Sequence, residues 1–141
     1  GQYTSIRLFD DYVHMAMGLP SGTCATSGSC GSYLVVEGDG SLYPCDFYCL
    51  DQWKLGEVGQ QPLDAFLEGE KEKTFLEEGQ RHPAECAGCP SRSLCFGGCK
   101  RDWYTDETGV HNYFCPAFTR FFQHAGPRLA EIARAEAAFR P

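Results

Sequence analysis

The sequence predicts a small α+β domain made of one β-hairpin, several helices and long loops pinned by cysteines. Three observations predict this class. Gly38-Asp39-Gly40 separates two apolar runs, which is typical of a hairpin. Apolar residues three or four positions apart after residue 62 indicate amphipathic helices. Nine cysteines in 141 residues mark the segments between these elements.

The first 32 residues predict a strand, a helix and a loop. Ser5 to Leu8 is short and apolar enough for a strand, and Asp10 or Asp11 is a suitable cap for a helix that ends at Gly18. The following SGTCATSGSCGS contains only small residues and cysteines, so this loop can bend closely around a bound group.

The hairpin brings cysteines together. Its strands are YLVVE (33–37) and SLY (41–43). If Glu37 pairs with Ser41, Cys45 falls opposite Tyr33. Cys30 is then three residues, about 10 Å, from that point. With Cys24 one flexible loop away, we expect three thiols to converge.

Two helical regions follow. Pro62 begins an amphipathic segment with an apolar face (Leu63, Phe66 and Leu67), a break is expected at Gly69, and the helix resumes through Phe75 and Leu76. The glutamates between residues 68 and 78 predict a solvated helix face. Pro116 begins the last helical region, which Gly126-Pro127 is expected to break. Its aromatic and aliphatic stripes predict core packing.

Charge and composition exclude several classes of protein. The net charge is −7 and the pI about 5.0, with no basic stripe for nucleic acid. No apolar run approaches the roughly 18 residues of a membrane span. The start, GQYTSIRLFDDY, is unlike a signal peptide, and Gly1 is a plausible remnant of a cleaved tag. We therefore expect a cytoplasmic protein.

The cysteines favour metal binding over disulfides. Their number is odd, and the chain is long enough to fold without disulfides. Four lie within CAGCPSRSLCFGGC (86–99), and both zinc and iron–sulfur clusters accept four thiolates. The hairpin supplies three thiols and this run with Cys115 supplies five, which is enough for two sites of four.

The spacing favours iron–sulfur clusters and leaves zinc open. Only Cys86 and Cys89 form a CxxC pair, whereas zinc sites commonly use two. Gly97 and Gly98 allow the backbone to approach a cluster closely. Cys-Pro occurs twice, as in ferredoxin-type ligation. A helix that starts at Pro116 would direct its positive end at an anionic cluster.

The order of the cysteines resembles a known signature. Cys30, Gly40 and Cys45, followed by the 86–99 run and Cys115, resemble the seven-cysteine pattern of the SPASM domain, a C-terminal extension of radical SAM enzymes that modify peptides. SIRLFDDYVHMAMG, the extra Cys24 and YLVVEGDGSLYPCDFY resemble the anaerobic sulfatase-maturating enzymes within that group. The match runs from about residue 4 to 103, with Cys115 beyond it.

The resemblance implies two auxiliary [4Fe–4S] clusters. The first would be bound by Cys24, Cys30, Cys45 and Cys99, and the second by Cys86, Cys89, Cys95 and Cys115. It also implies a division into residues 1–20, the end of a preceding barrel or linker, residues 21–122, the SPASM domain, and residues 123–141, a C-terminal helix.

The resemblance further implies an activity for the intact enzyme: oxidation of a sulfatase Cys or Ser to formylglycine. The CxxxCxxC motif that would hold a third cluster with S-adenosylmethionine, in an N-terminal radical SAM barrel, is absent from this sequence. The chain alone is therefore expected to be inactive. Implied partners are that barrel, an unfolded sulfatase polypeptide and a flavodoxin or ferredoxin-type electron carrier.

The resemblance also places a catalytic base at Asp46, directly after Cys45, where Asp could otherwise serve only as a turn residue. Cys49 departs from the family pattern and is expected to be a free cysteine. The four histidines are expected to be solvated or core residues.

The sequence leaves three alternative functions open: a domain that chiefly positions the substrate, a SPASM domain of another peptide-modifying enzyme, and a structural zinc module. Zinc is also a possible substitute for the clusters in the isolated chain.

Overall fold

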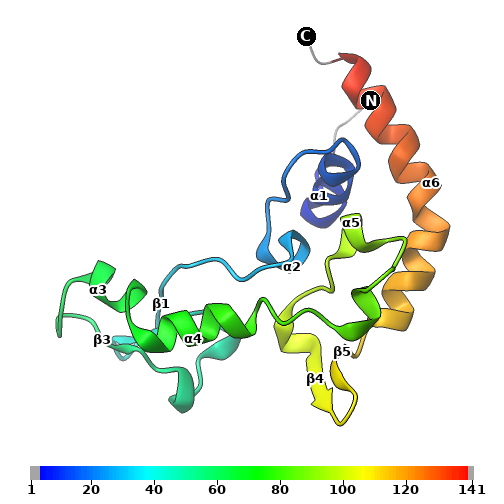
Figure 1. Cartoon of the computed structure of the whole chain (residues 1–141). Helices are drawn as coiled ribbons and strands as arrows, with labels where there is room; N and C mark the ends of the chain where they lie inside the picture. Colours follow the sequence, from blue (N-terminus) through cyan, green and yellow to red (C-terminus); the bar gives the residue numbers. More distant parts are fainter. Residues whose placement is uncertain (1–3, 140–141) are drawn as a thin grey trace. The chain divides into compact units, whose positions relative to one another are not determined.

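The protein forms two compact units in a computed structural model that describes residues 4–139. Unit 1 contains the residues up to Gly28 and those from His82 onwards, and unit 2 contains Ser29–Arg81. Residues 1–3 and 140–141, the ends of the first and last predicted segments, lie outside the described residues. Helices and small antiparallel sheets make up both units, which confirms the α+β class (Figure 1).

Unit 2 is built on a three-stranded antiparallel sheet in the order β1 (Val35–Val36), β2 (Ser41–Tyr43), β3 (Gly56–Glu57). Val36 pairs with Leu42, and the Glu37 N–H donates to the Ser41 carbonyl at 2.9 Å. The predicted hairpin and its register are therefore confirmed. The sequence did not predict β3, because a two-residue Gly-Glu strand carries no periodic signal.

The helices of unit 2 follow the predicted pattern. The 3-10 turns η1 (Asp46–Tyr48) and η2 (Asp51–Trp53) come after the hairpin, and α3 (Leu63–Leu67) and α4 (Glu70–Glu78) follow. They are separated at Gly69, as expected. Leu42, Phe66 and Phe75 are buried.

One residue of α4 corrects the prediction of a solvated acidic face. Glu72 is fully buried, and the Ser32 hydroxyl donates a 3.2 Å hydrogen bond to its Oε1. A buried carboxylate requires polar partners, which come from distant parts of the chain that helical periodicity does not reveal.

Unit 1 packs α1 (Arg7–Ala16) against α6 (Cys115–Phe139). Tyr12 of α1 meets the Phe122 ring edge-on at a centroid distance of 5.0 Å, and Leu129 completes this buried cluster. The other elements of unit 1 are α2 (Cys24–Ser27), η3 (Ala84–Cys86), α5 (Arg92–Cys95), η4 (Lys100–Asp102), β4 (Trp103–Asp106) and β5 (Gly109–Asn112). Strands β4 and β5 form an antiparallel hairpin.

The start of the chain differs from the prediction. The expected strand at Ser5–Leu8 is wrong, since α1 begins at Arg7 with Ile6 as its N-cap. Asp11 is no cap either: its carboxylate accepts from the Gly22 N–H and the Thr23 hydroxyl, both at 2.9 Å. Packing of Tyr12 on α6 favours helix over the weak strand propensity of this segment.

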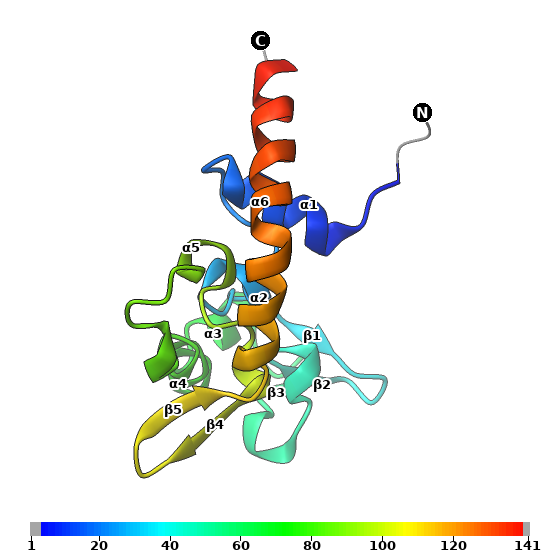
Figure 2. The ribbon, with the colours of Figure 1, turned by 90° about the vertical axis from the view of Figure 1, so that its right-hand side faces the viewer.

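The expected break at Gly126-Pro127 is also wrong. Helix α6 runs through Pro127 over 25 residues (Figure 2). A proline clashes with the Cβ of the preceding residue, and Gly126 has none. Phe122 and Leu129, both buried, hold the helix on either side. No helix within residues 4–139 is long and apolar enough to span a membrane.

Candidate metal centre

Four cysteines of unit 1 line one recess. Cys86 ends η3, Cys95 ends α5 and Cys115 begins α6, with Cys89 in the turn between η3 and α5. The recess is partly open to solvent, and Phe118 and Phe122 line it as well. The structure thus brings together the four thiols predicted for the second site.

The electrostatics of this recess favour the protonated thiols of Cys86 and Cys95. Burial raises the pKa of Cys86, and the nearby Cys95, Cys115 and Cys89 raise it further. Burial also raises the pKa of Cys95, although the Gly97 and Gly98 N–H groups oppose this by donating to its sulfur. Several thiolates in one recess therefore need a cationic metal group to coexist.

Position 97 requires glycine because of its backbone conformation and because its neighbours leave no room for a Cβ. Its φ is +89°, a region that other residues rarely adopt. A Cβ there would lie 2.8 Å from Pro83 Cδ and 3.0 Å from Cys86 Sγ. The backbone at Gly97 therefore lies close to Pro83 and to the Cys86 thiol, and its predicted approach to a cluster stays a prediction.

The four thiols of the recess are a donor set that both zinc and an iron–sulfur cluster accept. A tetrahedral zinc site, with Zn–S bonds of about 2.3 Å, holds its sulfurs about 3.8 Å apart. Among residues 4–139, no three His, Cys, Asp or Glu side chains are arranged to hold a single metal ion. The positive N-terminal end of α6 lies at Cys115, which favours an anionic group in the recess.

Of the thiols predicted for the first site, Cys24 and Cys99 lie in unit 1, and Cys30 and Cys45 lie in unit 2. In unit 1, burial raises the pKa of Cys99, and the neighbouring Cys24 contributes to the same shift. In unit 2, Cys45 is buried and Cys30 is partly buried. The joining of these two pairs in one cluster stays a prediction.

Asp46 lies at the end of the first hairpin, as the first residue of η1. Its Oδ1 accepts a 3.1 Å hydrogen bond from the Tyr33 hydroxyl and lies 3.5 Å from Cys45 Sγ. The Tyr33 oxygen is also 3.3 Å from Cys45 Sγ. Burial, followed by contact with Cys45 and Asp46, raises the pKa of Tyr33, so this phenol remains a donor.

Cys49 is set apart from the other thiols by its partners. Its Sγ lies 3.7 Å from the Cys45 carbonyl oxygen. Burial and a hydrogen bond to Glu37 raise its pKa to about 11. It is therefore a protonated thiol at neutral pH, and its place outside both clusters stays a prediction.

Residues 24–90 match the family model of SPASM, an iron–sulfur cluster-binding domain. The chain carries a SPASM domain. Known proteins are similar to almost the whole chain.

The chain is 38% identical over 135 residues to the cysteine-type anaerobic sulfatase-maturating enzyme of Clostridium perfringens (strain 13 / Type A). It is 30% identical over 129 residues to the serine-type enzyme of Bacteroides thetaiotaomicron. These alignments cover 94% and 88% of the chain, but only 36% and 31% of the relatives. The chain thus spans about a third of the relatives' length.

A solved structure, native anSMEcpe with bound AdoMet and Kp18Cys peptide, has the same fold. Its TM-score is 0.84 at 36% identity, with 94% of this chain and 37% of that chain covered. A second structure, of native anSMEcpe with bound AdoMet, gives 0.83.

Sequence reasoning missed several polar residues of this SPASM domain. Tyr33 could have been found, because the predicted register places it opposite Cys45. His111 and Asn112 carried no local signal, since their partners Glu85 and Gly97 lie 26 and 15 residues earlier in the chain.

Proposed function

We propose that this SPASM domain binds two [4Fe–4S] clusters and belongs to a radical SAM enzyme that oxidises a sulfatase Cys or Ser to formylglycine. The observation that carries the proposal is the recess lined by Cys86, Cys89, Cys95 and Cys115, in a chain similar to sulfatase-maturating enzymes. Such clusters, when bound, would act as one-electron acceptors. Substrate positioning is the second role of the domain.

The proposed ligands of the second cluster are the four thiols of the recess. Cys24, Cys30, Cys45 and Cys99 are proposed for the first cluster, from the order of cysteines in the sequence. S-adenosylmethionine and a third cluster belong to the proposed N-terminal barrel. An unfolded sulfatase polypeptide and a flavodoxin or ferredoxin-type carrier are the proposed partners, in the cytoplasm.

Asp46 is the proposed general base. Its exposed carboxylate accepts the proton of the substrate thiol or hydroxyl as the neighbouring carbon is oxidised to a carbonyl. The Tyr33 hydrogen bond occupies one carboxylate oxygen and fixes the orientation of the group. The other oxygen is left for the substrate proton.

Metal analysis of anaerobically reconstituted chain tests the proposal. Two four-cysteine sites predict about eight irons and about eight sulfides per chain. If protein reconstituted with iron, sulfide and zinc contains about two zinc ions and no sulfide, the domain is a structural zinc module instead. Zinc in aerobically purified protein is no such evidence, because vacant thiolate sites capture zinc readily.

A further inference from the structure

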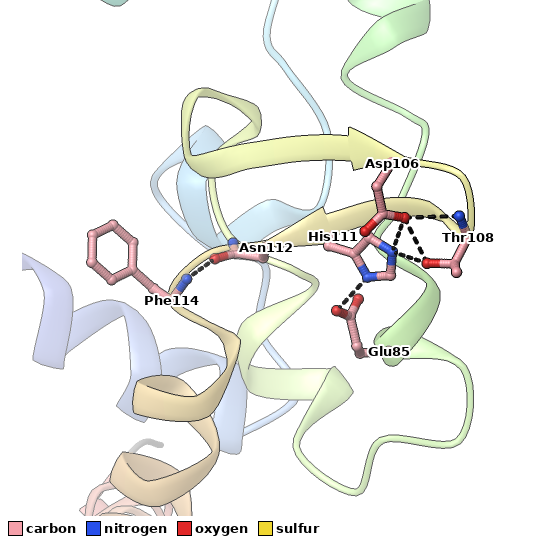
Figure 3. Close-up of polar contacts among 6 residues, drawn as sticks. All are labelled: Glu85, Asp106, Thr108, His111, Asn112 and Phe114. Carbon is pink, nitrogen blue, oxygen red and sulfur yellow. Dashed lines mark hydrogen bonds and ion pairs between the residues drawn. The ribbon is translucent and has the colours of Figure 1, made fainter.

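The β4–β5 hairpin contacts the segments that carry Cys86, Cys95 and Cys115, three of the four proposed ligands of the second cluster. His111 and Asn112, adjacent residues of β5, make these contacts (Figure 3). Their side chains reach toward different segments, so one short strand bonds to parts of the chain that are distant in sequence.

Asn112 joins two ligand-bearing segments. It is buried, and its Nδ2 donates to the Gly97 carbonyl at 2.6 Å. Its Oδ1 accepts from the Phe114 N–H at 2.6 Å. Gly97 follows Cys95 by two residues, and Phe114 directly precedes Cys115. This one amide therefore fixes the positions of the Cys95 loop and the start of α6 relative to each other.

His111 holds the third segment. Its Nδ1 lies 2.7 Å from Glu85 Oε1, and Glu85 directly precedes Cys86. On the other side of the ring, Nε2 lies 3.2 Å from Asp106 Oδ1 and 2.7 Å from the Thr108 hydroxyl. Figure 3 shows the ring between the two carboxylates. Only the imidazolium has an N–H for each of them.

The charged surroundings of His111 are mostly acidic. Glu85 comes from η3 and Asp106 from β4, and the ring of Tyr104 lies at a centroid distance of 5.3 Å. Arg120 of α6 lines the same open groove as Glu85 and Tyr104. The hydrogen bond to Glu85, with the nearby Asp106 contributing, raises the pKa of His111 above its ordinary 6.5.

The open groove also bears on how water reaches the recess of the proposed cluster. Its volume is about 980 Å³. Glu85, Asn112, Cys115 and Thr119 line both the groove and the cluster recess. Glu85, which bonds to His111, and Asn112 itself therefore lie between the recess of the proposed cluster and the open groove.

We propose that His111 and Asn112 are positioning residues that clamp the three ligand-bearing segments of the second cluster, and that the His111 contact is strongest while its imidazole carries a proton. The inference rests on the proposed ligands of that cluster. Because the folded pKa of His111 is raised, its stabilisation is complete below about pH 6.5 and is lost as the pH rises through the folded value. Asn112 does not titrate, so its contribution is independent of pH.

Iron release to a chelator tests the clamp. The chain is reconstituted anaerobically in a Cys45→Ser background, in which iron reports the second site. The readout is the ratio of the release rates of each variant and its parent. Release from His111→Gln is expected to be about fivefold faster than from its parent near pH 6, and less than twofold faster near pH 8.

Two further variants make the result specific. Asn112→Ala is expected to speed release by a similar factor at both pH values. His124→Gln, an exposed histidine of α6, is expected to release iron at the parental rate. A His111→Gln ratio that is the same at both pH values, or that His124→Gln reproduces, would overturn the proton-dependent clamp.

The test separates failure of the clamp from failure of the proposed ligands. Iron and sulfide are measured first, and their absence from the reconstituted parent would refute the cluster. The clamp is then tested by thermal unfolding of the same proteins. A melting-temperature gap between parent and His111→Gln that is larger near pH 6 than near pH 8 supports it, and an equal gap refutes it.

Discussion

Three side chains at the end of the first hairpin, Tyr33, Cys45 and Asp46, lie within 3.5 Å of one another. The 3.1 Å bond from the Tyr33 hydroxyl joins Asp46 to the first strand segment. This contact distinguishes Asp46 from an ordinary turn residue, whose carboxylate bonds to nearby backbone N–H groups.

The role proposed for Asp46 predicts the behaviour of Asp46→Asn in the full-length enzyme. Asparagine is nearly isosteric but takes no proton, so formylglycine production is expected to fall by at least about a hundredfold. Cleavage of S-adenosylmethionine, measured as 5′-deoxyadenosine, is expected to continue, and iron content to stay unchanged. Both products are quantified by mass spectrometry.

Asp51→Asn is a matched control. Asp51 is exposed and begins η2 as Asp46 begins η1, but it is not adjacent to a proposed ligand. Its substitution is expected to leave formylglycine production intact. Full product formation by Asp46→Asn would leave this residue a turn residue only.

At the scale of elements, the sequence predicted those features that residues close together in the chain determine. The glycine-containing loop fixed the hairpin register, and Pro62 and Gly69 marked the ends of helices in unit 2. The errors arose where distant packing overrides local preference. Tyr12 on Phe122 favours a helix at the start of the chain, and burial of Phe122 and Leu129 carries α6 through a proline.

The unbroken α6 predicts that Pro127→Ala stabilises unit 1. Proline within a helix removes one backbone hydrogen bond and crowds the preceding turn, at a cost of about 3 kcal/mol in exposed helices. Gly126 relieves part of that crowding, so we expect a gain of about 1–2 kcal/mol. Urea unfolding followed by circular dichroism measures it.

Pro116→Ala is the control for this substitution. Pro116 lies in the first turn of α6, where a backbone N–H has no helical acceptor. Its replacement restores no helical hydrogen bond and is expected to add little stability. Equal stabilisation by both substitutions would show that Pro127 does not strain the helix.

At the scale of the whole chain, the grouping of four thiols around one recess was predictable, and the residues that support it were not. The family resemblance grouped Cys86, Cys89 and Cys95 with Cys115, and these four thiols line the recess. The contacts of His111 and Asn112 depend on chain folding over 15 to 26 residues. Such polar pairs leave no periodic pattern in a single sequence.

The proposed division of ligands predicts different effects for two nearby substitutions. Cys99→Ala is expected to remove the first cluster, and Cys115→Ala the second, although Cys99 lies in the same run as Cys95. Each variant, reconstituted anaerobically, is expected to retain about four irons. Electron paramagnetic resonance of the reduced proteins should show a different remaining signal in each.

Two variants with the same remaining signal would contradict this division. Cys49→Ala is the matched control, because Cys49 is a thiol outside both proposed sets. It is expected to keep about eight irons and both signals.

The hairpin that gathers the Cys86, Cys95 and Cys115 segments also bears on how a cluster enters its site. Hydrogen bonds made by His111 and Asn112 hold these segments to one strand. Little conformational entropy is then left for the cluster to remove when it binds. Delivery of a preformed cluster to this recess therefore resembles the docking of a ligand into a preorganised receptor, with affinity set by thiolate–iron bonds rather than by the cost of ordering the chain.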